Sequence, residues 1–160
     1  MVLEEELDNA AFLRQFTPAH QKKLAGLARL KEYQADDVIF AEGEHCPEVY
    51  LVLDGEVGLE IRVPGCGVIE AHRVGPGELL GWSAVLGGGP MTATAQAATR
   101  CRLAALGADA VVALAEREPR FGLEFFRRLS AALAERLRAT RLQIPESARD
   151  KFRALREAAD

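Results

Sequence analysis

The chain has 160 residues and a mass of 17.4 kDa, a length that fits one domain burying roughly 70% of the surface of its unfolded chain. A net charge of −4 argues against nucleic acid as a partner, and three scattered cysteines without a CxxC pair argue against a disulfide framework or a cluster-type metal site. The acidic start MVLEEELD and the absence of a long apolar run indicate neither an export signal nor a membrane span, so we expect a cytoplasmic protein.

The first 29 residues are predicted to hold the N-terminal helices. Thr17 followed by Pro18 is typical of an N-cap with proline at the first helical position. Apolar residues at 24, 25 and 27 supply one face of a short helix that we expect to end near Arg29.

Residues 30–106 consist of short runs rich in valine, isoleucine, leucine and tyrosine, separated by turn residues. The clearest predicted hairpin joins residues 48–53 to residues 56–61 through Asp54-Gly55, because Asp-Gly supplies the positive φ angles of a two-residue turn. Short strands at this spacing, without long helices between them, favour a β-sandwich or barrel over a parallel sheet.

After Gly107 the pattern is helical, with helices predicted at residues 108–118 and 121–144 and Pro145 ending the second. One apolar stripe on the long helix must be buried against the chain's own strands or against a second copy. We predict a homodimer through this stripe, which consists of Phe126, Leu129, Leu133 and Leu137. The 160 residues then form a single domain of N-terminal helices (1–29), a β-roll (30–106), lid and dimerisation helices (107–144) and a tail (145–160).

The glycine-rich segment at residues 77–95 carries the strongest chemical signal. It reads as a strand, a short helix at residues 82–86 and a return into another strand. Gly81 lets the backbone turn closely into that helix, whose free N–H groups and positive dipole end form an anion site. An ordinary turn is the alternative interpretation, because glycine clusters between strands are more often turns.

Four motifs in this order resemble the cyclic-nucleotide-binding domain family, to which the catabolite activator protein and related bacterial regulators belong. They are DVIFAEG at 37–43, LVLDGEV at 51–57, GPGELLG at 75–81, and RLSAAL with RLRAT within 128–140, and the likeness spans about residues 8–144. The resemblance implies a mainly β domain with flanking helices. Its centre would be an eight-stranded jelly-roll-like barrel, also called a double-stranded β-helix, with an N-terminal helix and a long C-terminal helix that serves as lid and dimer contact.

The chain departs from the family pattern at two positions. In members that bind cyclic AMP, a glutamate just after the glycine of the phosphate-binding cassette takes the ribose hydroxyl, and an arginine at the start of the next strand pairs with the phosphate. These positions look like Trp82 and Met91 here. Each charge-assisted hydrogen bond is worth about 1.5–3 kcal/mol, so losing both would weaken ordinary cyclic-nucleotide binding by roughly two to four powers of ten.

Other features of the family's site remain in the sequence. The resemblance implies backbone donors around Gly81, a phosphate contact at Thr92 and a purine contact at Thr140. Trp82 either stacks on a planar ligand or fills the former ribose pocket, and we favour the second; Met91 is expected to fill the core. The candidate ligand-binding residues are Gly81, Trp82, Ser83, Ala84, Met91, Thr92 and Thr140, for a cyclic nucleotide or another small anionic ligand. Arg136 or Arg141 of the long helix is an alternative phosphate partner.

The remaining reactive residue types suggest no catalytic site. His45 and Cys46 are adjacent and are expected at the surface, while His20 and His72 stand alone. Cys101 is expected to be buried in a strand and Cys66 to be an exposed thiol in a turn. No serine, cysteine or histidine has a recognisable orienting partner, so we expect no enzyme and no metal site.

The sequence therefore favours a regulatory domain that senses a ligand and signals to an unidentified protein partner. The alternatives are a ligand-free dimeric interaction module and a truncated transcriptional regulator. After the long helix only residues 146–160 remain, too few for a helix-turn-helix, so we expect no direct DNA binding and no membrane partner.

Overall fold

The computed structural model describes residues 6–7, 10–143 and 153–154 of the chain. Helix α2 (Pro18–Leu27) begins as the sequence predicts, with the Thr17 hydroxyl accepting a hydrogen bond from the His20 N–H at 3.3 Å. It ends two residues before the predicted Arg29, because Ala28 is already extended and pairs with Leu106. The boundary is set by a strand partner that is distant in sequence.

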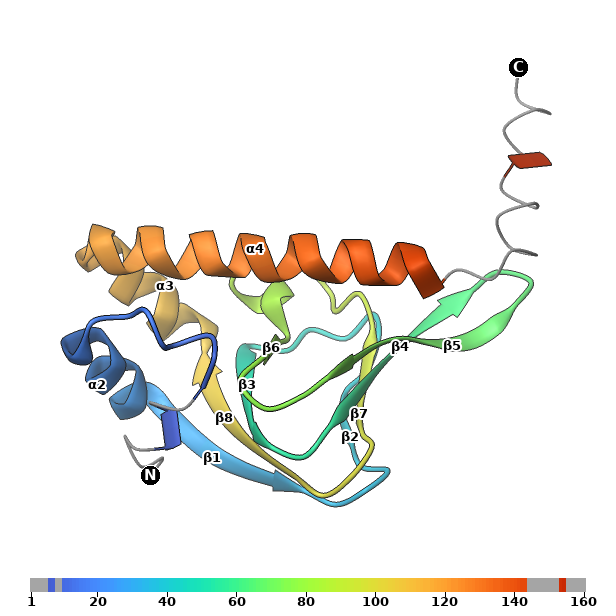
Figure 1. Ribbon diagram of the computed structural model, residues 1–160, viewed down its shortest axis with the longest axis horizontal. Helices are drawn as coiled ribbons and strands as arrows, with labels where there is room; N and C mark the ends of the chain where they lie inside the picture. The colour runs from blue at the N-terminus through green and yellow to red at the C-terminus, as the bar shows by residue number, and fades with distance from the viewer. Residues whose placement is uncertain (1–5, 8–9, 144–152, 155–160) are drawn as a thin grey trace.

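Two antiparallel four-stranded sheets form the centre of the molecule (Figure 1). The first has the order β1 (Ala28–Tyr33), β8 (Cys101–Gly107), β3 (Glu48–Asp54) and β6 (Leu79–Leu80). The second has the order β2 (Val38–Phe40), β7 (Thr94–Ala97), β4 (Val57–Val63) and β5 (Gly67–Val74). Most neighbours in the sheets are distant in sequence, which confirms the predicted mainly β, jelly-roll-like fold.

The predicted hairpin around Asp54-Gly55 is wrong in its pairing. Its two strands, β3 and β4, belong to different sheets, and the turn is a corner between them. Gly55 does have a positive φ of 84°, and a Cβ added there would lie 2.2 Å from the carbonyl oxygen of Arg100. The hairpin that does form joins β4 to β5, and the Cys66 N–H donates to the Val63 carbonyl at 3.0 Å in its turn.

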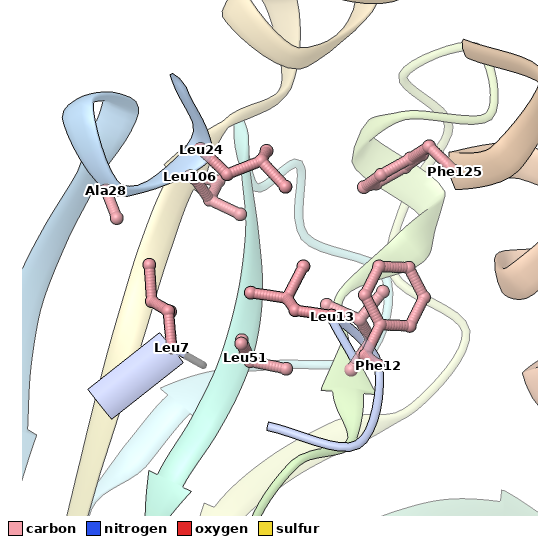
Figure 2. A pocket seen from close by; sticks show the side chains of 9 residues that line it. Leu7, Phe12, Leu13, Leu24, Ala28, Leu51, Leu106 and Phe125 are labelled. Carbon is pink, nitrogen blue, oxygen red and sulfur yellow. The ribbon is translucent and has the colours of Figure 1, made fainter. Parts of the chain in front are cut away.

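Apolar side chains form two cores, one inside the roll and one between the first sheet and the helices. Strand β6 contributes to both, because Leu80 points into the roll and Leu79 points toward the helices. Figure 2 shows part of the second core, where side chains from the N-terminal segment, the first sheet and the long helix converge. The space left between them has a volume of about 10 Å³. They are Leu7, Phe12, Leu13, Leu24, Ala28, Leu51, Leu79, Leu106 and Phe125.

Helix α3 (Ala108–Arg117) leads into the long helix α4 (Pro119–Gln143), which runs along one side of the roll as far as the β4–β5 hairpin (Figure 1). Both lie within two residues of the predicted ranges. None of the helices in the described ranges is long and apolar enough to cross a membrane. The predicted tail lies outside the described residues except for 153–154.

The four residues of the predicted dimer stripe differ in their environment. Leu129 is buried at 2% exposure in the protein's own second core, and Phe126 and Leu133 are half-buried against that core. Leu137 is 65% exposed. The roll itself therefore buries part of the stripe, and Leu137 is the member with a large surface free for another contact.

Candidate functional site

The segment after β6 forms a sharp turn that only glycine fits well. Gly81 has a φ of 78°, and a Cβ there would lie 3.1 Å from the carbonyl oxygen of Glu48. The predicted helix at residues 82–86 is instead a single 3₁₀ turn, η1 (Trp82–Ala84). The N–H of Ala84, one of the predicted anion donors, already donates to the Gly81 carbonyl at 3.2 Å. A turn this short has little dipole to attract an anion.

The glycine-rich return after η1 is fastened to the turn at residues 43–45. The N–H of Gly43 donates to the Met91 carbonyl and the Met91 N–H donates to the Glu44 carbonyl, both at 2.8 Å. The Nδ1 of His45 also donates to the Gly88 carbonyl at 3.0 Å. His45, predicted to be an ordinary surface residue, thus helps hold in place the glycine-rich loop at residues 87–91, which with the turn at Gly81 corresponds to the family's phosphate-binding cassette.

Five of the predicted ligand-binding residues line one cavity: Gly81, Trp82, Ser83, Met91 and Thr92. Met91 is 3% exposed and packs among the apolar side chains of the roll. The cavity has a volume of about 10 Å³, about what one water molecule needs. Small-molecule sites typically measure roughly 300–1,000 Å³, so this cavity is far smaller than such a site.

Arg136 of α4 reaches the same place from the side of the long helix. Its guanidinium lies over the Trp82 ring, 4.4 Å from the ring centroid, and its Nη2 donates to the Leu79 carbonyl. The side chain is buried at 8% exposure, and Nη1 has no hydrogen-bond partner among the described residues. Burial lowers the pKa of Arg136 to about 10, although the negative charge of Glu78 acts in the opposite direction.

His72 of β5 lies near this arginine and does not stand alone as the sequence suggested. Its Nε2 is buried and has no hydrogen-bond partner among the described residues. Burial and then the charge of Arg136 lower the pKa of His72 below its ordinary value, against the opposing charges of Glu78 and Glu70. The sequence offered no signal for this residue beyond its place in a strand.

Two further residues on α4 were candidates. Thr140 is half-buried and follows Arg136 by one helical turn, so both lie on the same face. The side chain of Arg141 lies outside the described part of the chain. Arg136, one of the two arginines proposed as phosphate partners, lies beside the turn at Gly81.

A polar network lies beneath Gly81. The buried carboxylate of Glu48 accepts hydrogen bonds from Arg29 at 2.7 Å, Tyr50 at 2.9 Å and Lys31. Burial alone would raise the pKa of Glu48, but the hydrogen bonds from these three residues outweigh it and hold the pKa below its usual value. The network is satisfied within the protein, so it supports the turn and offers no free group to a ligand.

The other histidine and cysteines form no reactive cluster. His20 bonds the Glu118 carboxylate at 3.0 Å. Cys101 is buried in β8, Cys66 is exposed in the β4–β5 turn, both as predicted, and Cys46 is half-buried. In the described part of the chain, no three histidine, cysteine or acidic side chains gather where they could hold a metal ion.

Comparison with known proteins gives one consistent result. The family model described as cyclic nucleotide-binding domain matches residues 30–118. The CRP-like cAMP-activated global transcriptional regulator of Mycobacterium tuberculosis is 25% identical over 138 residues, which are 86% of this chain and 60% of that protein. The chain therefore spans about three fifths of the length of the curated relative it matches.

Solved structures show the same fold. A cyclic nucleotide-binding domain from Methylobacillus flagellatus has a TM-score of 0.80 and 24% identity, over 88% of this chain and 82% of that one. The Thermus thermophilus catabolite activator protein has a TM-score of 0.69 and 28% identity, over 83% of this chain and 61% of that one. The family match includes the turn at Gly81 but ends before Arg136.

Proposed function

This chain belongs to the cyclic nucleotide-binding domain family, and we propose that it is a ligand-sensing regulatory module whose pocket is held closed by its own helix α4. The contact of Arg136 with the cassette carries this proposal. The guanidinium lies 4.4 Å from the centroid of the Trp82 ring and donates to the Leu79 carbonyl, so one side chain joins the lid helix to the ligand pocket. A ligand that displaces Trp82 or draws Arg136 away changes how α4 lies on the roll.

We further propose that the module has lost ordinary cyclic AMP specificity. Trp82 and Met91 supply no charge for the ribose or the phosphate, and with their neighbours they leave a cavity of only about 10 Å³. A cyclic nucleotide would have to displace these side chains while losing two charge-assisted contacts worth about 1.5–3 kcal/mol each. We expect no tight binding of cyclic AMP or cyclic GMP.

Trp82 is the only tryptophan in the chain, so its fluorescence reports directly on the closed pocket. Titration with cyclic AMP and cyclic GMP is expected to leave the emission unchanged at micromolar concentrations, and calorimetry should agree. A low-micromolar dissociation constant would overturn the loss of specificity. Native mass spectrometry of protein purified from its host is expected to show a bound small molecule. If the purified protein carries no small molecule and its Trp82 emission does not change when host metabolite extract is added, the ligand-free interaction module is favoured.

Restoring the charges tests whether the scaffold of the pocket is intact. Trp82→Glu with Met91→Arg adds contacts worth roughly 3–6 kcal/mol, partly offset by desolvating the new pair, so cyclic AMP affinity is expected to rise by more than about a hundredfold before that offset. Because the carboxylate introduced by Trp82→Glu would lie beside Arg136, the double substitution is also made together with Arg136→Met. The matched control replaces Trp82 and Met91 with glutamine. If the folded Trp82→Glu, Met91→Arg variant does not bind cyclic AMP at millimolar concentration, the pocket has been remodelled, and the interaction module is favoured.

We also propose that the module acts in the cytoplasm as a homodimer that signals to a protein partner. The 65% exposure of Leu137 on α4 supports a helix-to-helix contact, and the net charge of −4 favours a protein partner over DNA. Light scattering at tens of micromolar is expected to show a dimer that Leu137→Glu dissociates. This variant is cleaner than Leu133→Glu, because Leu133 also packs against the protein's own core. A wild-type monomer would remove the dimer from the proposal.

A further inference from the structure

Two buried nitrogens without partners lie where α4 covers the roll, and we propose that they bind the oxyanion of a small organic ligand, a carboxylate or a phosphate. They are Nη1 of Arg136 and Nε2 of His72. This inference rests on the proposed function, because the oxyanion would draw away the same arginine that closes the pocket. It places the negative end of the ligand at the lid helix, where the cassette position Met91 offers no charge.

The charge of Arg136 is the first argument. A buried charge is costly unless a partner compensates it, and such charges are normally paired. Elsewhere on α4, Arg128 pairs with Glu124 at 2.6 Å and Arg138 with Glu135 at 3.8 Å. Arg136 is more deeply buried than either, yet no carboxylate of the described residues lies within 4.0 Å of it.

The acidic residue whose charge acts on Arg136 already accepts a hydrogen bond from another group. Glu78 influences Arg136 through its charge, but its Oε2 accepts a hydrogen bond from the Gly75 N–H at 2.8 Å. The single hydrogen bond from Arg136 goes to the neutral Leu79 carbonyl. The guanidinium therefore has no ion-pair partner among the described residues, and its Nη1 is available to donate to a carboxylate or phosphate oxygen.

His72 adds a second donor of the right kind. Burial and the neighbouring Arg136 charge favour the neutral imidazole, as the lowered pKa of His72 indicates. In the tautomer with a hydrogen on Nε2, that atom donates to an anion without adding another positive charge beside the arginine. A neutral donor next to a fixed cation suits an oxyanion with a single negative charge.

The surrounding side chains indicate an organic ligand. The Trp82 ring covers one side of the guanidinium, and Phe40, Leu59 and Met91 line the adjoining cavity. An apolar or planar body attached to the oxyanion would pack against these groups as it displaces the Trp82 ring. Buried water would also satisfy these nitrogens, and it is the alternative that the experiment separates.

Trp82 fluorescence and thermal unfolding of the whole chain provide the test. The probes are benzoate, its neutral analogue benzamide, and inorganic phosphate, each up to about 10 mM, which fills roughly nine tenths of a site with a millimolar dissociation constant. Benzoate is expected to change the emission and raise the melting temperature, and benzamide is not. A response to phosphate as well supports a site that recognises the oxyanion itself.

Variants assign the response to the two nitrogens. Arg136→Met is expected to weaken benzoate binding at least about tenfold and His72→Gln a few fold, because each removes one donor. Arg136→Lys keeps the charge and should retain part of the response, and circular dichroism confirms that each variant folds. The matched control is Arg138→Met, an exposed arginine on the same helix, which should bind like the wild type.

Two results would overturn the oxyanion site: equal benzoate binding by Arg136→Met, or no response of the wild type to either anion, as expected for a buried water. The ligand-free spectra separate this failure from that of the proposed function. If the Arg136→Met substitution shifts the Trp82 emission in the absence of any ligand, the contact between Arg136 and Trp82 that closes the pocket exists. In that case only the oxyanion site is wrong. If the emission is unchanged, the closing contact is absent and both proposals fail.

Discussion

Replacing Arg136 with methionine is expected to change the stability of the fold very little while releasing α4 from the cassette. The guanidinium over the Trp82 ring is worth about 0.5–2 kcal/mol, and the charged hydrogen bond to Leu79 about 1.5–3 kcal/mol. Against this, the fall of its pKa from 12.5 to about 10 corresponds to roughly 3 kcal/mol of penalty on the charged form. Because these contributions nearly cancel and methionine keeps much of the apolar packing, the net change should stay within about 1–2 kcal/mol.

Urea unfolding followed by circular dichroism measures this change in the free energy of unfolding, and Trp82 emission measures the release. We expect the emission to shift to longer wavelength, because the indole loses the cover of the guanidinium. Arg138→Met should alter neither signal. A loss of more than about 3 kcal/mol in Arg136→Met would refute the reasoning, since it would mean that the native guanidinium is fully compensated.

Gly81→Ala should lower the free energy of unfolding in urea by about 1–3 kcal/mol, because a positive φ and a close backbone oxygen both oppose a Cβ. The control Gly43→Ala also has a positive φ but meets open space, so it should cost only the φ penalty of about 1 kcal/mol. Leu129→Ala should cost about 3–5 kcal/mol, while Leu137→Ala stays within about 0.5 kcal/mol at a concentration where the chain is monomeric; similar losses would contradict their different burial. The pKa of His72 is lower in the folded chain than in the unfolded one, so the unfolded chain takes up the proton first as the pH falls. The free energy of unfolding should therefore decrease from about pH 7.5 to pH 5, and His72→Gln should flatten that slope.

Local sequence signals predicted the elements well and their partners poorly. The Thr17-Pro18 cap is present, and at Asp54-Gly55 the chain does change direction, although only Gly55 has the predicted positive φ and Asp54 still belongs to β3; such features depend on backbone preferences of adjacent residues. The same turn does not say whether its two strands pair with each other. Strand β3 pairs with β8 and β6 instead, and this choice depends on contacts that the fold brings together from far along the chain.

The candidate site divides in the same way. The sequence by itself determined the turn at Gly81 and the uncharged residues Trp82 and Met91 at the two positions that differ from the family, because a motif is a run of neighbouring residues. Only the tertiary structure decided that Arg136 lies over the Trp82 ring beside this turn and that its charge acts on His72. Laying α4 along the roll leaves Nη1 of Arg136 and Nε2 of His72 buried without hydrogen-bond partners among the described residues, and no local sequence pattern encodes this burial.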